Sequence, residues 1–113
     1  MNIQIFGTKK SNDSKKAERY FKERKIKYQF IDMKSKGMSA GELQSVIKAA
    51  GGIDNLINPD FKDKQTLKLM EYISDDAKFE KMLDYPELIR VPVVRNGKQA
   101  TIGYEPDVWK GWE

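Results

Sequence analysis

A strand, a sharp polar turn and an amphipathic helix follow one another within residues 3–17, and this order limits the fold more than any other part of the chain. Apolar and polar side chains alternate until Gly7, which predicts a short strand over 2–6. Residues 11–14 are all good N-cap types, and the apolar positions after them recur at helical spacing to about Lys25. A strand-to-helix turn aims backbone N–H groups at one point, so it suits an anion or a reactive side chain.

A second strand is predicted over Tyr28–Met33. Phe30 and Ile31 are adjacent apolar residues, so the alternation is imperfect, which is typical of a strand buried on both faces. Strand, helix and strand at this short spacing predict a parallel pair joined by a right-handed crossover.

Helices are expected in the middle of the chain. Ser39 and Glu42 form a capping box, and Gly51-Gly52 stops the helix that follows. The further helical segments are expected over 53–57, over 64–73, and from a cap at Asp75 or Asp76 to Tyr85-Pro86.

The last part of the chain reads as two strands and a helix. A strand is predicted over 88–95, Asn96-Gly97 predicts a type I′ hairpin, and 98–104 returns antiparallel. Pro106 suits the first position of a final short helix. A proline inside a strand fits only at an edge or a cis turn. This order of elements resembles thioredoxin-like folds, in which a cis-proline precedes the third strand, so we predict that Val91–Pro92 is cis.

This element order predicts an α/β fold with a thioredoxin-like, mixed four-stranded sheet. One block is βαβ, the other is ββα, and helices are inserted between them. The length of 113 residues fits a single domain over 1–113. We expect its thioredoxin-like core over about 1–34 and 88–113, with the helical insertion over about 35–87.

The chain contains no cysteine and no histidine. Thiolate nucleophiles, disulfides and thiolate metal ligands are therefore excluded, and the commonest general base is missing. No acidic cluster has metal-ligand spacing, so we expect neither a metal nor a cofactor. No apolar run approaches the length of a membrane span and no signal peptide is recognisable, which predicts a soluble, cytoplasmic protein without a membrane partner.

The positive charge is concentrated in the first half of the chain. Residues 1–50 hold 12 Lys and Arg against 5 Asp and Glu, whereas the remainder holds 9 against 12. A basic half could suit an acidic protein surface or a phosphate backbone, and its simplest interpretation is a solvated helix face. No aromatic residue alternates with the basic ones, so sequence-specific binding of nucleic acid is not supported.

Several short segments, taken in order, resemble one family. They are strand-Gly7, Lys15-Lys16-Ala17, Leu56-Ile57-Asn58, Leu88–Val94 and Ile102-Gly103-Tyr104. With this order and spacing the chain resembles the arsenate reductase (ArsC) family, which also includes the Spx-type transcriptional regulators. The resemblance covers nearly the whole length.

The resemblance also shows where this chain departs from the pattern. The family has a cysteine in the turn before the first helix, and Ser11 stands there. Serine has no comparable ionised fraction near neutral pH and cannot form a mixed disulfide. Asn58-Pro59-Asp60 replaces the family's Asn-Thr-Arg, and Val91 replaces an arginine before the proline. Arg90 lies one place earlier, where a strand would turn it to the opposite face.

Two interpretations of the turn stay open. Ser11 and its neighbours can serve only as a helix N-cap. Alternatively, Lys10, Ser11 and Asn12 form a residual anion pocket with the N–H groups of the helix and with Arg90, and the charge of Asp13 nearby would weaken it.

At the level of function, our first hypothesis is a non-catalytic ArsC/Spx-like protein that binds another macromolecule. Resemblance to the Spx branch makes RNA polymerase the first partner to test. The alternative is an enzyme or binder of an oxyanion or glutathione with an oxygen-based site of Ser11, Arg90 and Tyr104. A third possibility is an interaction module that uses another surface.

Overall fold

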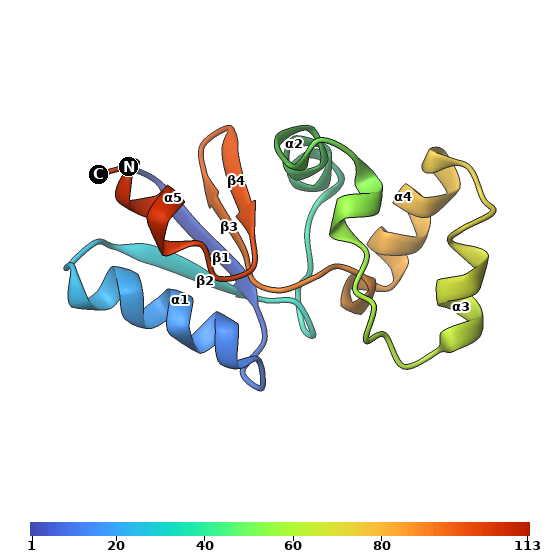
Figure 1. Ribbon diagram of the computed structural model, residues 1–113, viewed down its shortest axis with the longest axis horizontal. Coiled ribbons are helices and arrows are strands. Elements are labelled where there is room, and N and C mark those ends of the chain that lie inside the picture. The colour runs from blue at the N-terminus through green and yellow to red at the C-terminus, as the bar shows by residue number, and fades with distance from the viewer.

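The computed structural model describes residues 1–113 and shows a twisted sheet with helices on both faces (Figure 1). The strands are β1 (Ile3–Gly7), β2 (Tyr28–Asp32), β3 (Val93–Asn96) and β4 (Gln99–Ile102). The α-helices are α1 (Asn12–Glu23), α2 (Ala40–Ala50), α3 (Lys64–Leu69), α4 (Asp75–Asp84) and α5 (Pro106–Lys110), and the 3-10 helices are η1 (Ile53–Leu56) and η2 (Pro86–Leu88). No helix is long and apolar enough to cross a membrane.

The four strands form one mixed sheet in the order β2-β1-β3-β4. The β1–β2 pair is parallel, whereas β1–β3 and β3–β4 are antiparallel. The predicted βαβ and ββα blocks are therefore confirmed, and the sheet has the thioredoxin-like arrangement expected from the sequence. The Val91–Pro92 peptide bond is cis, as predicted.

Each face of the sheet has its own hydrophobic cluster. On one face, α1 and α5 cover β1 and β3 through Ala17, Phe21 and Trp109. On the other face, α2 packs against Phe6 and Val93 in a cluster that continues into η1, α4 and η2. Figure 1 shows α3 and α4 beyond the β4 side of the sheet, on the opposite side from α1, which agrees with an elongated molecule of 42 × 26 × 23 Å. The helical segment thus shares one core with the sheet.

Two strand predictions need correction. β2 is an edge strand, so it is not buried on both faces: Gln29 is exposed and Ile31 is its one buried residue. The predicted strand over 88–95 begins only at Val93, because the chain before it forms η2 and a single bridge between Ile57 and Ile89.

The hairpin and one helix cap also differ from the predictions. Asn96 pairs with Gln99, so Gly97 and Lys98 are the loop residues, and only Gly97 has a positive φ, of 60°. Glycine at the first central position is the type II′ pattern rather than type I′. The predicted cap of α4 at Asp75 or Asp76 is wrong, because both residues lie within the first turn of the helix. The N-cap is Ser74, whose side chain accepts a hydrogen bond from Ala77 N.

Candidate functional site

Ser11 begins α1 as its N-cap. Its backbone is extended, with φ −76° and ψ 119°, and its Oγ accepts a hydrogen bond from Ser14 N at 3.1 Å. This bond satisfies one of the N–H groups that the first helical turn leaves free. The hydroxyl therefore has a structural role that accounts for a serine at this position.

A second serine fixes the turn to the strand. Ser14 is fully buried, and its Oγ accepts from Thr8 N at 3.3 Å. A Cβ on Gly7 would lie 2.5 Å from that Oγ, so the close approach of strand and helix requires glycine. The turn is thus a tightly packed connection.

The turn opens onto a cleft of about 840 Å³ that lies between α1, η1 and the β4 side of the sheet. Ser11 and Asp13 line it from the start of α1, and Arg90 and Val91 line it from the segment before β3. Its remaining polar or charged side chains are Asp54, Asn55, Asn58, Asp60 and Thr101, and its apolar ones are Ala50, Ile57, Pro59, Ala100 and Ile102.

A short antiparallel contact holds Arg90 beside the 58–60 segment. Arg90 N donates to Leu56 O and Asn58 N donates to Leu88 O, both at 2.8 Å. Asp60 N then donates to Asn58 Oδ1 at 3.0 Å, which closes the turn that places Asp60 in the cleft wall. Because Arg90 precedes the strand, the alternation expected from the sequence does not apply, and its side chain reaches the cleft of Ser11.

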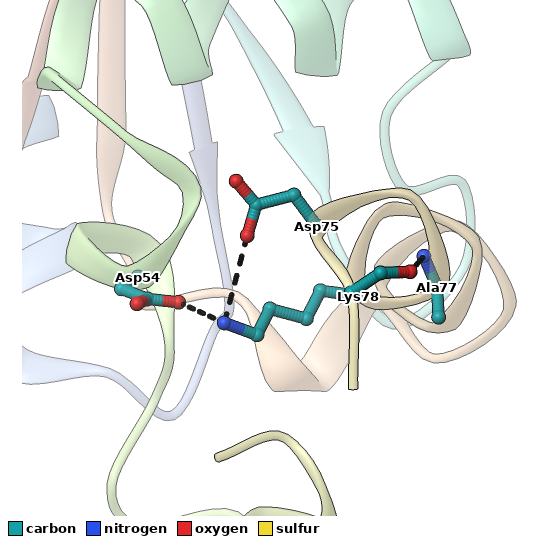
Figure 2. A network of polar contacts seen from close by, with 5 residues as sticks. Asp54, Asp75, Ala77 and Lys78 are labelled. Atoms are coloured by element: carbon teal, nitrogen blue, oxygen red, sulfur yellow. Dashed lines mark hydrogen bonds and ion pairs between the residues drawn. The ribbon is translucent and has the colours of Figure 1, made fainter. Parts of the chain in front are cut away.

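A buried lysine anchors the opposite wall. Figure 2 shows Lys78 of α4 reaching Asp54 of η1 and Asp75 of its own helix. Lys78 Nζ lies 2.7 Å from Asp54 Oδ1 and 3.6 Å from Asp75 Oδ1, and only 7% of the residue is exposed. The hydrogen bond to Asp54 raises the pKa of Lys78, with smaller contributions from the charges of both carboxylates. The charge of Asp54 is therefore largely matched within the protein.

The cleft is poorly suited to an oxyanion. With Asp54 paired to Lys78, Asp13 and Asp60 face the single cation Arg90. Arg90 makes no ion pair in the structure, so it does not neutralise Asp60 at close range. Like charges repel, and at an effective dielectric near 20 two unit charges about 4 Å apart interact by about 4 kcal/mol. No group of three or more acidic side chains is arranged to hold a metal ion.

Only some of the site residues predicted from the sequence line the cleft. Ser11 and Arg90 line the cleft, whereas Lys10 and Asn12 are exposed and do not. Tyr104 also lies outside it: the chain turns at Gly103, with φ 88°, and carries the Tyr104 ring to Trp109, 5.5 Å away between centroids. The oxygen-based site of Ser11, Arg90 and Tyr104 is therefore not assembled.

Asp13 was expected beside the Ser11 turn, where its charge weakens an anion pocket, and it lines the cleft. Asp54 was not predicted as a cleft residue, because it follows Gly51-Gly52, a segment interpreted as a helix stop. Their common location depends on the packing of η1 against the rest of the fold, which no local pattern encodes.

Nearly the whole chain is similar to known proteins of one family. The model of the ArsC family matches residues 6–112. The global transcriptional regulator Spx 2 of Oceanobacillus iheyensis is 26% identical over 112 residues, which cover 95% of this chain and 80% of that protein.

Solved structures agree in fold. An arsenate reductase from Vibrio cholerae superposes with a TM-score of 0.83 at 25% identity, covering 96% of this chain and 94% of the other. An ArsC-family-related protein from Bacteroides fragilis gives a TM-score of 0.86 at 17% identity and full coverage of both chains, a likeness of fold.

Proposed function

Because the chain belongs to the ArsC family, we propose that it is a non-catalytic member that acts by binding another macromolecule, with RNA polymerase as the first partner to test. Ser11 is the main support. It stands where the resemblance places the family's cysteine, the chain contains no cysteine at all, and the Oγ of Ser11 serves as a helix cap. Neither a thiolate attack nor a mixed disulfide can take place at this turn.

The surroundings of Ser11 point the same way. Asp60 occupies the position of the expected arginine and lines the cleft, and Val91 occupies the position before the cis proline. A residue that activates Ser11 would have to be a carboxylate, since the chain contains no histidine. The scaffold is thus complete while the chemical groups of a reductase are absent.

A regulatory role through binding is supported by the similarity of the chain to a transcriptional regulator. One similar protein is a global transcriptional regulator, and resemblance to the Spx-type regulators makes RNA polymerase the first candidate. The exposed side of α1 is rich in Lys and Arg, a charge that suits an acidic macromolecular surface.

The test is direct capture of RNA polymerase freed of nucleic acid. Immobilised protein should retain the purified polymerase, and the variant Lys15→Glu/Lys16→Glu/Lys22→Glu should lose it. A matched variant, Lys36→Glu/Lys68→Glu/Lys98→Glu, makes the same change of charge at exposed positions elsewhere and should still bind. No retention by the wild-type protein would remove RNA polymerase as the partner.

The cleft supplies a separate test of the alternative function. Phosphate, arsenate or glutathione can be titrated while the amide resonances of residues 11–14 and 58–60 are followed. With Asp13 and Asp60 in the wall we expect no saturable shift at these amides. A saturable shift there would favour an oxyanion- or thiol-binding protein instead.

A further inference from the structure

The outer side of α1 carries a row of cations without partners. Lys15, Arg19 and Lys22 follow one another at i, i+4 and i+7, and Lys25 and Lys27 continue the row beyond the end of the helix. We call these five residues the basic track. All five are exposed, and none makes an ion pair or a side-chain hydrogen bond within the protein.

The geometry of the helix aligns the first three residues of the track. Buried Ala17, Tyr20 and Phe21 occupy the side of α1 that faces the sheet, so Lys15, Arg19 and Lys22 point to the opposite side. At a rise of 1.5 Å per residue, Lys15 and Lys22 are about 10.5 Å apart along the axis. Figure 1 shows α1 at the margin of the molecule, with the sheet on one side of it.

The carboxylates beside the track do not cancel it. Glu18 accepts a hydrogen bond from Tyr28 Oη at 3.0 Å and is directed to the β2 side. Glu113 lies 3.7 Å from Arg24, which is not part of the track. Glu23 is exposed among these cations and makes no ion pair in the structure, so one carboxylate remains beside five cations.

The end of the track contains a strained lysine. Lys25 has φ 56°, a left-handed conformation that favours glycine. It is the C′ residue of a Schellman motif, because Ile26 N donates to Phe21 O at 2.9 Å and Lys25 N donates to Lys22 O at 3.1 Å. A lysine therefore stands where glycine would cost less.

The strained conformation puts Lys25 into a hollow with two other lysines. The hollow has about 450 Å³ and is lined by Lys22, Lys25, Ile26, Lys27 and Tyr28, with no carboxylate among them. A lysine near a helix C-terminus also complements the helix dipole, but the dipole does not require the left-handed position itself.

We propose that the basic track binds the phosphate backbone of nucleic acid without sequence preference. Four of its five cations are lysines, which are depleted in the centres of protein–protein interfaces but are good point-charge partners for phosphate. The five cations are exposed and unpaired, and the hydroxyl of Tyr28, the aromatic residue beside them, is bound to Glu18. This activity goes beyond the proposed function, whose partner is a protein.

The experiment measures fluorescence anisotropy with two labelled 20-base-pair DNA duplexes of unrelated sequence. Equal affinity for both duplexes is expected. With five phosphate contacts, the slope of log K against log salt is about −4.5, a fall in affinity of several hundredfold between 50 and 200 mM salt. Clear preference for one sequence, or no binding at 50 mM salt, would overturn the proposal.

Two triple variants separate the track from net charge. Lys15→Gln/Arg19→Gln/Lys22→Gln should reduce the slope by about 3 and weaken binding at least tenfold at 50 mM salt. Lys36→Gln/Lys68→Gln/Lys98→Gln removes the same charge elsewhere and should leave the slope nearly unchanged. Equal losses in both variants would contradict the proposal.

Lys25→Gly separates binding from folding. Glycine relieves the left-handed strain, so the urea midpoint should rise while the salt slope falls by about 1. A more stable protein that binds DNA more weakly cannot be explained by damage to the fold. An unchanged slope would remove Lys25 from the track.

The outcomes also separate the two proposals. Capture of RNA polymerase that depends on the track, together with no duplex binding, would make the track a protein-docking surface and overturn this inference. Duplex binding without capture would leave the inference standing and remove the polymerase proposal.

Discussion

The two ends of α1 have opposite character. At its start the cleft holds Asp13 and Asp60 against the single cation Arg90, where the family resemblance leads one to expect an anion site. Along its outer side and beyond its end the basic track holds five exposed cations without partners. Positive charge in this chain therefore lies on the open surface rather than in the cleft, an arrangement that would suit a large polyanionic or acidic partner better than a small oxyanion.

Trp109→Ala is expected to have the largest effect, because α5 and α1 share one cluster beneath the track. Trp109 is fully buried, packs against Tyr20 and Phe21, and donates from Nε1 to Thr101 Oγ1 at 2.7 Å. Its loss should lower the free energy of unfolding by about 3–5 kcal/mol. Urea unfolding monitored by circular dichroism measures this.

The same variant tests whether the α1 face of the sheet and the cleft face unfold independently. Two transitions, with the α1 face unfolding first, would show that they are separate cooperative units. A single transition would show that both regions belong to one cooperative unit.

Asp60→Arg should reverse the character of the cleft. It restores a cation at the position of the family's arginine, next to Arg90. We expect arsenate or sulfate to bind at least tenfold more tightly than in the wild-type protein, which corresponds to about 1.4 kcal/mol. Isothermal titration calorimetry provides the measurement, and Asp84→Arg, exposed at the end of α4, controls for net charge. Equal gains in both variants would show that the cleft has no special role.

Ser11→Ala tests whether this residue is more than a cap. Removing the Oγ acceptor of Ser14 N should cost about 1 kcal/mol. Ser74→Ala removes an equivalent cap, whose Oγ accepts from Ala77 N at 3.2 Å, and should cost a similar amount. Thermal unfolding of both variants compares them. If Ser11→Ala instead stabilises the protein, Ser11 lowers the stability of the fold, and a role for its hydroxyl in binding or chemistry would have to explain its presence.

These regions also show what a single sequence can predict. The cap within residues 11–14, the capping box at Ser39 and the helix stop at Gly51-Gly52 are local hydrogen-bond or backbone requirements, and each was predicted correctly. The element order followed from periodicity. The cis Val91–Pro92 bond was expected from the resemblance of that order to thioredoxin-like folds, together with a proline that fits no regular strand.

Errors arose where distant segments decide the outcome. The path of the chain before Val93 depends on its contact with Ile57, and this contact, rather than strand alternation, brings Arg90 to the cleft. Lys78 is polar in sequence yet 7% exposed, because Asp54, 24 residues away, supplies its partner. The sequence therefore predicted Ser11 and the acidic Asp60 at the cleft, but not that Asp54 lines it with them.

Alkaline pH should have the smallest effect, and it should act on the α1 side of the sheet and on the cleft wall through different groups. Burial, followed by the hydrogen bonds to Glu113 and Glu18, raises the pKa values of Tyr20 and Tyr28, and the hydrogen bond to Asp54 raises the pKa of Lys78. A raised pKa means that the folded state holds its proton more tightly than the unfolded state. The stabilisation is then complete below the unfolded values, near 10 for tyrosine and 10.5 for lysine, and is lost as pH rises through the folded ones.

Urea midpoints at pH 9 and pH 11 measure this loss for the wild-type protein and for Tyr28→Phe and Lys78→Met. Phenylalanine cannot ionise, so Tyr28→Phe should flatten the pH dependence. Lys78→Met should flatten it as well, although it leaves Asp54 without its partner and lowers stability at both pH values. If Tyr28→Phe flattens the pH dependence of stability and Lys78→Met does not, the loss of stability at alkaline pH comes from the tyrosine beside α1, and the Asp54–Lys78 pair keeps its charge up to pH 11. The reverse result would make the Asp54–Lys78 pair the pH-sensitive element of the protein.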